Sequence, residues 1–124
     1  MIVQRVISIE RCVNMSDQKN AISRAFRMFQ SEAPQHASAW MQLVQNLSEA
    51  CVLDEKTREL AYLAVLAVLR FESGIPFHVQ MAKKAGATRN EVISAILLGL
   101  TPAGHAVTQV LPAAVEAFDL EQYT

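Results

Sequence analysis

The sequence predicts an all-α fold of about six helices built around a buried central helix. Only 4 glycines and 4 prolines occur in 124 residues, so the chain has few places to turn and should consist of long elements. Apolar residues make up 52% of the sequence and recur at helical spacing over most of its length. Residues 60–69 are apolar on every side, which indicates a helix enclosed by other elements.

The helices are expected to follow one another from residue 16 onward. Residues 1–15 fit either a strand or a helix and form an N-terminal extension. Residues 16–124 are predicted to form a single helical domain, since no linker, repeat or low-complexity tract divides them. The first helix starts near residue 16 with apolar residues at intervals of three and four. Pro34 opens the second helix, whose apolar side is expected to pack in the core.

Local signals delimit the third and fourth helices. Asp54 is a good N-cap for the third helix, because its carboxylate accepts hydrogen bonds from free backbone N–H groups. Residues 72–76 break that helix, and Gly74 is expected to supply a left-handed or tight turn. Pro76 suits the first turn of the fourth helix, which ends at Gly86.

The last two helices follow a clear start signal. Thr88 and Glu91 have the spacing of a capping box, in which each side chain bonds the backbone of the other residue. The fifth helix is expected to stop at Thr101 and Pro102. A sixth helix, residues 103–118, is kinked or split by Pro112.

Charge and hydrophobicity limit the partners of this chain. A net charge of −1, from 11 Lys and Arg against 12 Asp and Glu, gives no basis for binding nucleic acid or an anionic membrane surface. The longest apolar run has ten residues, about half of what spans a bilayer. Residues 1–13 show no targeting signal, so we expect a cytoplasmic protein. The high apolar fraction of so small a protein indicates that part of its surface faces another subunit of a homo-oligomer.

Metal and cofactor motifs do not occur. The two cysteines, Cys12 and Cys51, are too few for a disulfide scaffold or a zinc site. His36, His78 and His105 lack the short spacing of metal ligands, and the sequence contains no GxGxxG, P-loop or GxSxG motif. We therefore predict no metal and no cofactor.

Residues 53–100, LDEKTRELAYLAVLAVLRFESGIPFHVQMAKKAGATRNEVISAILLGL, resemble the carboxymuconolactone decarboxylase and alkylhydroperoxidase D-like (AhpD-like) family. In that family an acidic residue lies early in a helix, a CxxC pair and a histidine follow a turn, and a helix ending in AGAT precedes a capped helix. Weaker similarity extends the resemblance to residues 21–118. It implies an AhpD-like helical fold that assembles as a trimer or hexamer.

The redox branch of this family has the pattern Glu-x11-Cys-x2-Cys-x3-His, which falls on Glu59, Phe71, Gly74 and His78. Both cysteine positions lack sulfur, so the CxxC motif is degenerate. A thiol peroxidase needs one thiolate to attack the peroxide and a second thiol to resolve the sulfenic acid. The lactone decarboxylases of the same family use acid–base chemistry without thiols. The resemblance therefore points away from a peroxidase without establishing a decarboxylase.

His78 and Glu59 are the candidate catalytic residues. His78 lies near the start of the fourth helix, where the helix dipole disfavours the imidazolium and leaves a neutral imidazole to act as base or donor. Glu59 lies where a polar pattern gives way to the apolar run, a boundary that partly desolvates a carboxylate. The alternative for His78 is a structural histidine bonded to backbone, and the alternative for Glu59 is a solvated partner of Lys56 or of Arg58. In a straight helix Glu59 and residue 71 would lie about 18 Å apart, at ~1.5 Å per residue, so a shared site requires the chain to fold back or a second chain.

Arg70, Phe71, Glu72, Gly74 and His105 are candidate substrate-binding residues. The guanidinium of Arg70 is well suited to a carboxylate. His105 belongs to a turn with proline and glycine, which allows close backbone approach. The alternative is that these are ordinary surface residues of two turns.

Three functions remain open from the sequence. The first is a non-redox family member that uses His78 and Glu59 to transform or bind a small organic molecule. The second is a catalytically silent oligomeric scaffold or partner subunit. The third is a residual alkylhydroperoxidase, of peroxiredoxin type, that uses Cys51 or Cys12 with an external thiol.

Overall fold

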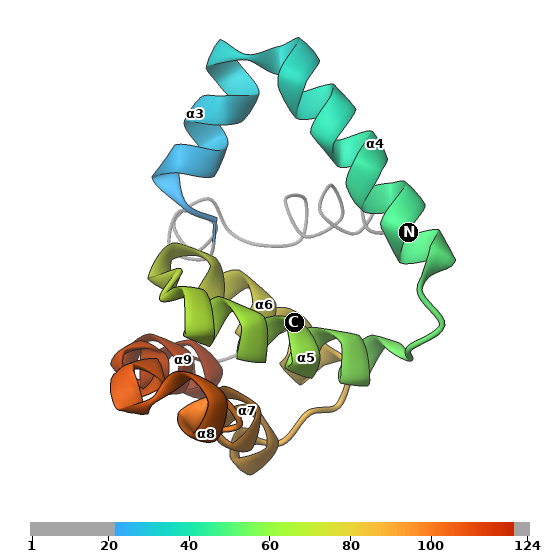
Figure 1. Ribbon diagram of the computed structural model, residues 1–124. Coiled ribbons are helices and arrows are strands. Elements are labelled where there is room, and N and C mark those ends of the chain that lie inside the picture. Colours follow the sequence, from blue (N-terminus) through green and yellow to red (C-terminus); the bar gives the residue numbers. More distant parts are fainter. Residues whose placement is uncertain (1–21, 121–124) are drawn as a thin grey trace. The chain divides into compact units, whose positions relative to one another are not determined.

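A computed structural model describes residues 22–120 of the chain (Figure 1). The chain forms two compact units: the first runs to Val52, and the second begins at Leu53. Six helices of nine residues or more lie within 22–120, and that part of the chain contains no strand. The prediction of an all-α fold with about six helices is confirmed. The predicted extension, residues 1–15, lies outside the described residues.

The first unit contains α3 (Arg24–Glu32) and α4 (Pro34–Ala50). Ser23 is extended and caps α3 by accepting a hydrogen bond from the backbone N–H of Phe26, so the helix expected from residue 16 does not pass through this point. Phe26 packs edge-on against Trp40, with ring centroids 5.6 Å apart. Among the residues of α4 only Ala37 is buried, and Leu47 is 61% exposed. The expectation that the apolar side of α4 packs in a core is therefore wrong for the described chain.

The second unit contains α5 (Glu55–Leu69), η1 (Glu72–Gly74), α6 (Ile75–Lys84), α7 (Arg89–Leu97), α8 (Leu100–Ala103), η2 (His105–Val110) and α9 (Leu111–Asp119). Helix α5 packs against α6 and α7, and α6 packs against α9. The largest fully buried side chains are those of Leu63, Ile75, Val79, Val92, Ile96, Val107 and Val110. These residues form the core that fixes α5 and α6 relative to each other.

Helix α5 ends in a left-handed turn at Arg70, where φ is 57°. The N–H of Arg70 donates to the carbonyl of Ala67 at 3.1 Å, and the N–H of Phe71 donates to the carbonyl of Leu66 at 3.0 Å. This pair of hydrogen bonds is a Schellman motif, which satisfies carbonyls at the end of the helix. Of the two turns expected at Gly74, left-handed or tight, the structure has the tight one: its φ is −87°, a value open to any residue, and its N–H donates to the carbonyl of Phe71 at 3.2 Å.

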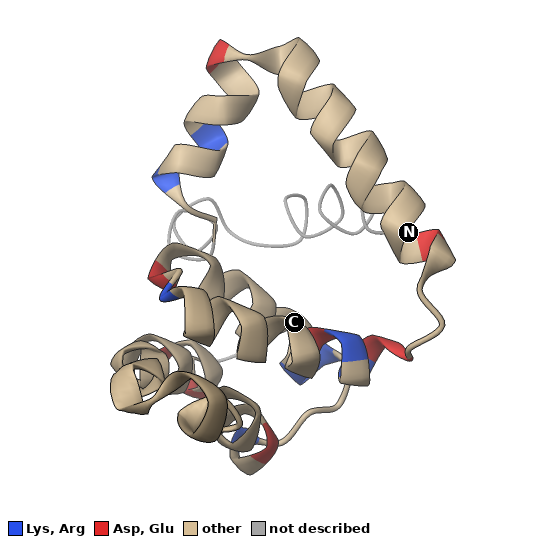
Figure 2. Cartoon of the chain, in the orientation of Figure 1, with Lys and Arg blue, Asp and Glu red and all other residues tan. Residues whose placement is uncertain are grey.

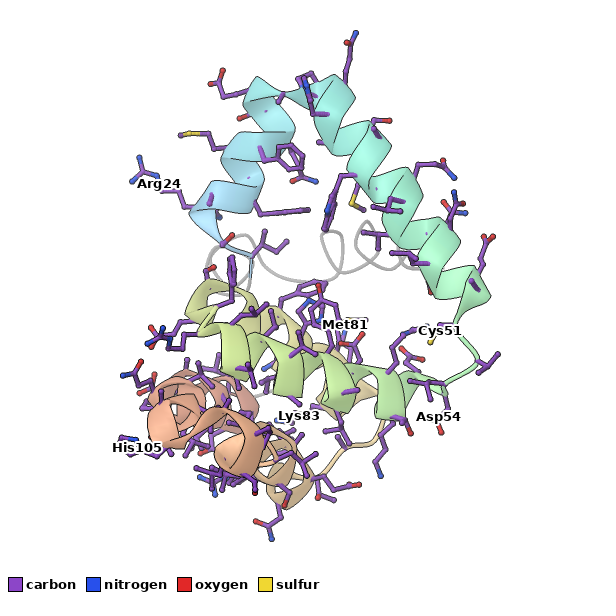
Figure 3. All side chains as sticks on the ribbon, viewed as in Figure 1. Arg24, Cys51, Asp54, Met81, Lys83 and His105 are labelled. Carbon is purple, nitrogen blue, oxygen red and sulfur yellow. The ribbon has the colours of Figure 1, made fainter. Side chains whose placement is uncertain are left out.

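Side chains of α6 bind the C-terminal end of α9. The ammonium group of Lys83, labelled in Figure 3, donates to the carbonyls of Phe118 at 2.6 Å and Leu120 at 3.1 Å. Gln80 donates to the carbonyl of Ala117. Because the last carbonyls of a helix lack partners within it and carry partial negative charge, these contacts both satisfy them and complement the helix dipole.

The capping box predicted for the fifth helix is confirmed. The N–H of Glu91 donates to the hydroxyl of Thr88 at 3.1 Å, and the N–H of Thr88 donates to the carboxylate of Glu91 at 2.9 Å. Pro102 does not end this helix; α7 ends at Leu97, and Pro102 lies inside the short α8, where a first-turn proline is tolerated. The predicted split near Pro112 is confirmed, since α9 begins at Leu111 directly after η2 and Pro112 lies in its first turn.

Within the described chain α5 is enclosed along one side only. Leu63 and Ala67 are fully buried, whereas Val65 is 58% and Leu69 is 59% exposed. The colours of Figure 2 place the charged residues of α5 in its first half, with none in its second half. The apolar run at residues 60–69, expected to be surrounded, therefore keeps an open apolar face.

The left-handed backbone at Arg70 predicts a stabilising substitution. A residue with a Cβ loses about 1–2 kcal/mol in this conformation, and glycine avoids most of that loss at a cost of roughly 0.5–1 kcal/mol in backbone entropy. We expect Arg70→Gly to raise the free energy of unfolding by about 0.5–1 kcal/mol in urea titrations followed by circular dichroism.

The matched control is Gly86→Ala at the end of α6. Gly86 has φ 96° in the same kind of turn, and an added Cβ there meets no atom within 4 Å, so the change introduces backbone strain without a clash. It should lower the free energy of unfolding by about 1 kcal/mol. If Gly86→Ala destabilises the protein while Arg70→Gly leaves its stability unchanged, the left-handed conformation of Arg70 has no net cost and the prediction is wrong.

Candidate functional site

The carboxylate of Glu59 on α5 and the imidazole of His78 on α6 form a close pair. Nδ1 of His78 lies 2.9 Å from Oε2 of Glu59. The Glu59 side chain is only 7% exposed and the His78 side chain 20% exposed, so the pair is largely shielded from water. Both residues come from one chain, because the reversal that begins at Arg70 folds α6 back onto α5. This reversal removes the separation that a straight helix would impose.

Two aromatic rings surround the imidazole. Tyr62 stacks on His78 with ring centroids 4.0 Å apart and an interplanar angle of 22°. Phe77 meets the same imidazole edge-to-face, at 5.1 Å and 84°. Sequence reasoning missed Tyr62, although its position three residues after Glu59 places both on neighbouring parts of one helix surface. Burial and, to a smaller extent, the negative charge of Glu59 raise the pKa of Tyr62, which keeps the phenol neutral.

The hydrogen bond to Glu59 bears on which ring nitrogen of His78 has a free lone pair. A carboxylate accepts hydrogen bonds, so a hydrogen bond from His78 to Glu59 requires the tautomer with the proton on Nδ1. A neutral imidazole protonated at Nδ1 has its lone pair at Nε2. Within the described chain, His78 forms its side-chain hydrogen bond through Nδ1, and Nε2 has no hydrogen-bond partner there. The arrangement therefore presents a basic nitrogen whose orientation is set by a buried carboxylate.

The turn between α5 and α6 holds four of the predicted substrate-binding residues. Arg70, Phe71 and Glu72 are exposed, and Phe71 is 57% exposed. Gly74 lies against Leu66, whose methyl groups would stand 3.4 and 3.5 Å from an added Cβ, an ordinary to slightly tight contact. The described residues show no hydrogen bond, ion pair or ring contact from this turn to the Glu59–His78 pair. The turn precedes His78 in sequence but is not joined to it by side-chain contacts.

His105 is separate from this pair. It lies exposed at the start of η2, and its carbonyl accepts a hydrogen bond from the hydroxyl of Thr108 at 2.8 Å (Figure 3). Within residues 22–120 its imidazole makes no contact with Glu59 or His78. The structure thus brings the two candidate catalytic residues together and does not bring His105 to them.

An open hollow of about 520 Å³ lies beside the first turn of α5 and the start of α7. Its lining residues are Asp54, Glu55, Lys56, Thr57, Leu60, Ala85 and Glu91. Lys56 and Glu91 form an ion pair of 2.7 Å in this hollow, and this contact is the main cause that lowers the pKa of Glu91. Neither Glu59 nor His78 lines it, so the hollow is not the candidate site.

Other reactive groups do not gather at the pair. Within residues 22–120 no three His, Cys, Asp or Glu side chains come together as ligands for one metal ion. Cys51 is a free, half-buried thiol at the C-terminal end of α4 (Figure 3), and Cys12 lies outside the described residues. A search of the described helices finds none with the length and apolar character needed to cross a membrane.

Comparison with known proteins bears on the family and the helical fold of the chain. No curated protein matches the chain. The sequence model of the carboxymuconolactone decarboxylase family matches residues 34–116, more than half of the 124 residues, and this match includes Glu59 and His78. The chain therefore belongs to the carboxymuconolactone decarboxylase family, as its resemblance to that family and to the AhpD-like proteins predicts.

Proposed function

We propose that this protein is a non-redox member of its family, in which Glu59 and His78 handle a small organic molecule by acid–base chemistry. The observation that carries the proposal is the 2.9 Å contact between Nδ1 of His78 and the buried carboxylate of Glu59. A histidine oriented by a carboxylate is a common arrangement for moving protons near neutral pH, because the free nitrogen accepts a proton and later returns it.

Each residue has a distinct role in this chemistry. Nε2 of His78 takes a proton from the bound molecule, and the ring becomes an imidazolium. The negative charge of Glu59, 2.9 Å from Nδ1, stabilises that cation and keeps the ring in one orientation. The imidazolium then returns its proton to the product. Arg70, exposed in the turn that precedes α6, is suited to bind a carboxylate of the same molecule.

The residues at the two sulfur positions of the redox branch support a non-redox role. Phe71 and Gly74 stand where a peroxidase needs an attacking thiolate and a resolving thiol, and neither side chain has a nucleophilic or oxidisable group. Cys51 belongs to the other compact unit of the chain.

The acid–base role predicts the effect of removing either partner. In the hydrolysis of p-nitrophenyl acetate, a general base takes a proton from the water that attacks the ester carbonyl, and p-nitrophenolate leaves. With this activated ester as probe, we expect His78→Gln to lower the rate above the uncatalysed background by at least about 100-fold, the usual contribution of a general base. Glu59→Gln lowers it as well, because an amide does not stabilise the imidazolium as a carboxylate does.

His36→Gln is the matched control, because it makes the same change at an exposed position of α4 and should leave the rate unchanged. Urea unfolding of each variant shows whether it remains folded. A folded His78→Gln variant that retains the wild-type rate would falsify the acid–base role and leave the pair as a structural contact.

The non-redox role predicts that the chain does not reduce alkyl hydroperoxides. With tert-butyl hydroperoxide and dithiothreitol, the wild type should be no faster than the Cys51→Ser and Cys12→Ser variants, since neither thiol belongs to a CxxC pair. A loss of measurable peroxide consumption in either variant would establish the residual peroxidase instead.

A gain-of-function variant provides a positive control for the peroxide assay. The double substitution Phe71→Cys and Gly74→Cys restores the CxxC spacing in the turn that precedes His78. The backbone at Gly74 suits any residue, and its new Cβ meets only the flexible methyl groups of Leu66. We expect this double variant to consume the hydroperoxide at a rate that exceeds the wild-type background.

We also propose that the protein assembles as a homo-oligomer, a trimer or hexamer, through its open apolar faces. Val65 and Leu69 on α5 are each more than half exposed, and so is Leu47 on α4. Exposed apolar surface of this kind on several neighbouring turns is typical of protein–protein contacts. Covering α5 with a second copy would complete the enclosure that its apolar run predicts.

Light scattering tests this assembly. The wild type should have a mass that is a multiple of 13.7 kDa, and Val65→Asp should shift it toward the single chain, because the substitution places a charge in the apolar face. Thr57→Asp, at an exposed position in the first turn of the same helix, should leave the mass unchanged. A wild type that is monomeric at the working concentration contradicts the proposal.

A further inference from the structure

Tyr62 makes the closest aromatic contact in the candidate site. Its ring stacks almost parallel on the imidazole of His78, with centroids 4.0 Å apart and an angle of 22°. It is supplied by α5, which also supplies Glu59 three residues earlier. One helix thus provides both the group that bonds the edge of the imidazole and the group that covers its face.

The contacts of His78 act in different directions. The hydrogen bond from Nδ1 to Glu59 lies along the edge of the ring and, taken alone, permits rotation of the ring about that bond. The stacked ring of Tyr62 restricts the tilt of the imidazole plane. Phe77 adds an edge-to-face contact. Together these contacts define the direction in which the free nitrogen, Nε2, points.

We propose that Tyr62 is a positioning residue for His78, whose ring holds the imidazole plane so that Nδ1 stays on Glu59 and Nε2 keeps one direction. The proposal rests on the acid–base function proposed above for the pair. Tyr62 acts through its aromatic ring and not through its hydroxyl, since the described residues give that hydroxyl no hydrogen bond.

The chemistry of the phenol agrees with this role. Its raised pKa, caused first by burial and then by the charge of Glu59, keeps Tyr62 neutral beside the carboxylate. A neutral aromatic ring also attracts a cation placed over its face. The stack therefore favours the imidazolium that forms when His78 takes a proton, in addition to fixing the plane of the neutral ring.

Two substitutions separate the ring from the hydroxyl. Tyr62→Phe keeps the stacked ring, and Tyr62→Leu removes it while retaining an apolar side chain. The ring-nitrogen chemical shifts of His78 report which nitrogen carries the proton. In the wild type and in Tyr62→Phe we expect a single form with the proton on Nδ1; in Tyr62→Leu we expect a mixture of the two tautomers.

The rate with p-nitrophenyl acetate provides a second measurement. Tyr62→Leu should lower it by roughly 2- to 12-fold, the range that corresponds to the loss of one aromatic stack, and Tyr62→Phe should leave it unchanged. Val65→Ala is the matched control for truncation of a half-exposed side chain on α5. It should alter neither the tautomer nor the rate, and light scattering shows whether any variant changes assembly.

The outcomes distinguish this inference from the function on which it rests. If Tyr62→Leu keeps the single Nδ1–H form and the wild-type rate, Tyr62 does not position His78. If Val65→Ala reproduces the loss, Tyr62 acts through assembly and the inference is wrong. If His78→Gln retains the rate while Tyr62→Leu still mixes the tautomers, the proposed function fails and the positioning of the ring stands.

Discussion

The reversal of the chain after α5 is the constraint on which the candidate site depends. Arg70 adopts a left-handed conformation, and two backbone hydrogen bonds close the end of the helix around it. Helix α6 then packs against α5, and His78 reaches Glu59 at 2.9 Å. Without this turn, a continued helix would move the two residues apart by ~1.5 Å for each residue between them.

The position of α6 is fixed from two sides, which makes it a rigid support for His78. Ile75 and Val79, on either side of His78 in the sequence, are fully buried in the core. Gln80 and Lys83 bind the last carbonyls of α9. A side chain carried by a helix that is packed and hydrogen-bonded in this way keeps its orientation better than one carried by a loop.

Membership in the carboxymuconolactone decarboxylase family does not specify the reaction, because one fold supports several reactions. The resemblance to the redox branch implies that Phe71 and Gly74 fall at its sulfur positions, whereas the carboxylate of Glu59 and the imidazole of His78 are present and in contact. The proposed acid–base function rests on this pair.

The sequence by itself determined the helical fold and the caps at Asp54 and Thr88, because helix caps are local properties of the chain. It made Glu59 and His78 candidates through the resemblance to a family pattern, and their contact came from the structure. The tertiary structure alone decided that the left-handed residue is Arg70 and not Gly74, that Tyr62 stacks on His78, and that residues 22–120 enclose α5 on one side only. These features depend on which surfaces meet after the chain reverses, and contacts between residues distant in sequence leave no periodic signal.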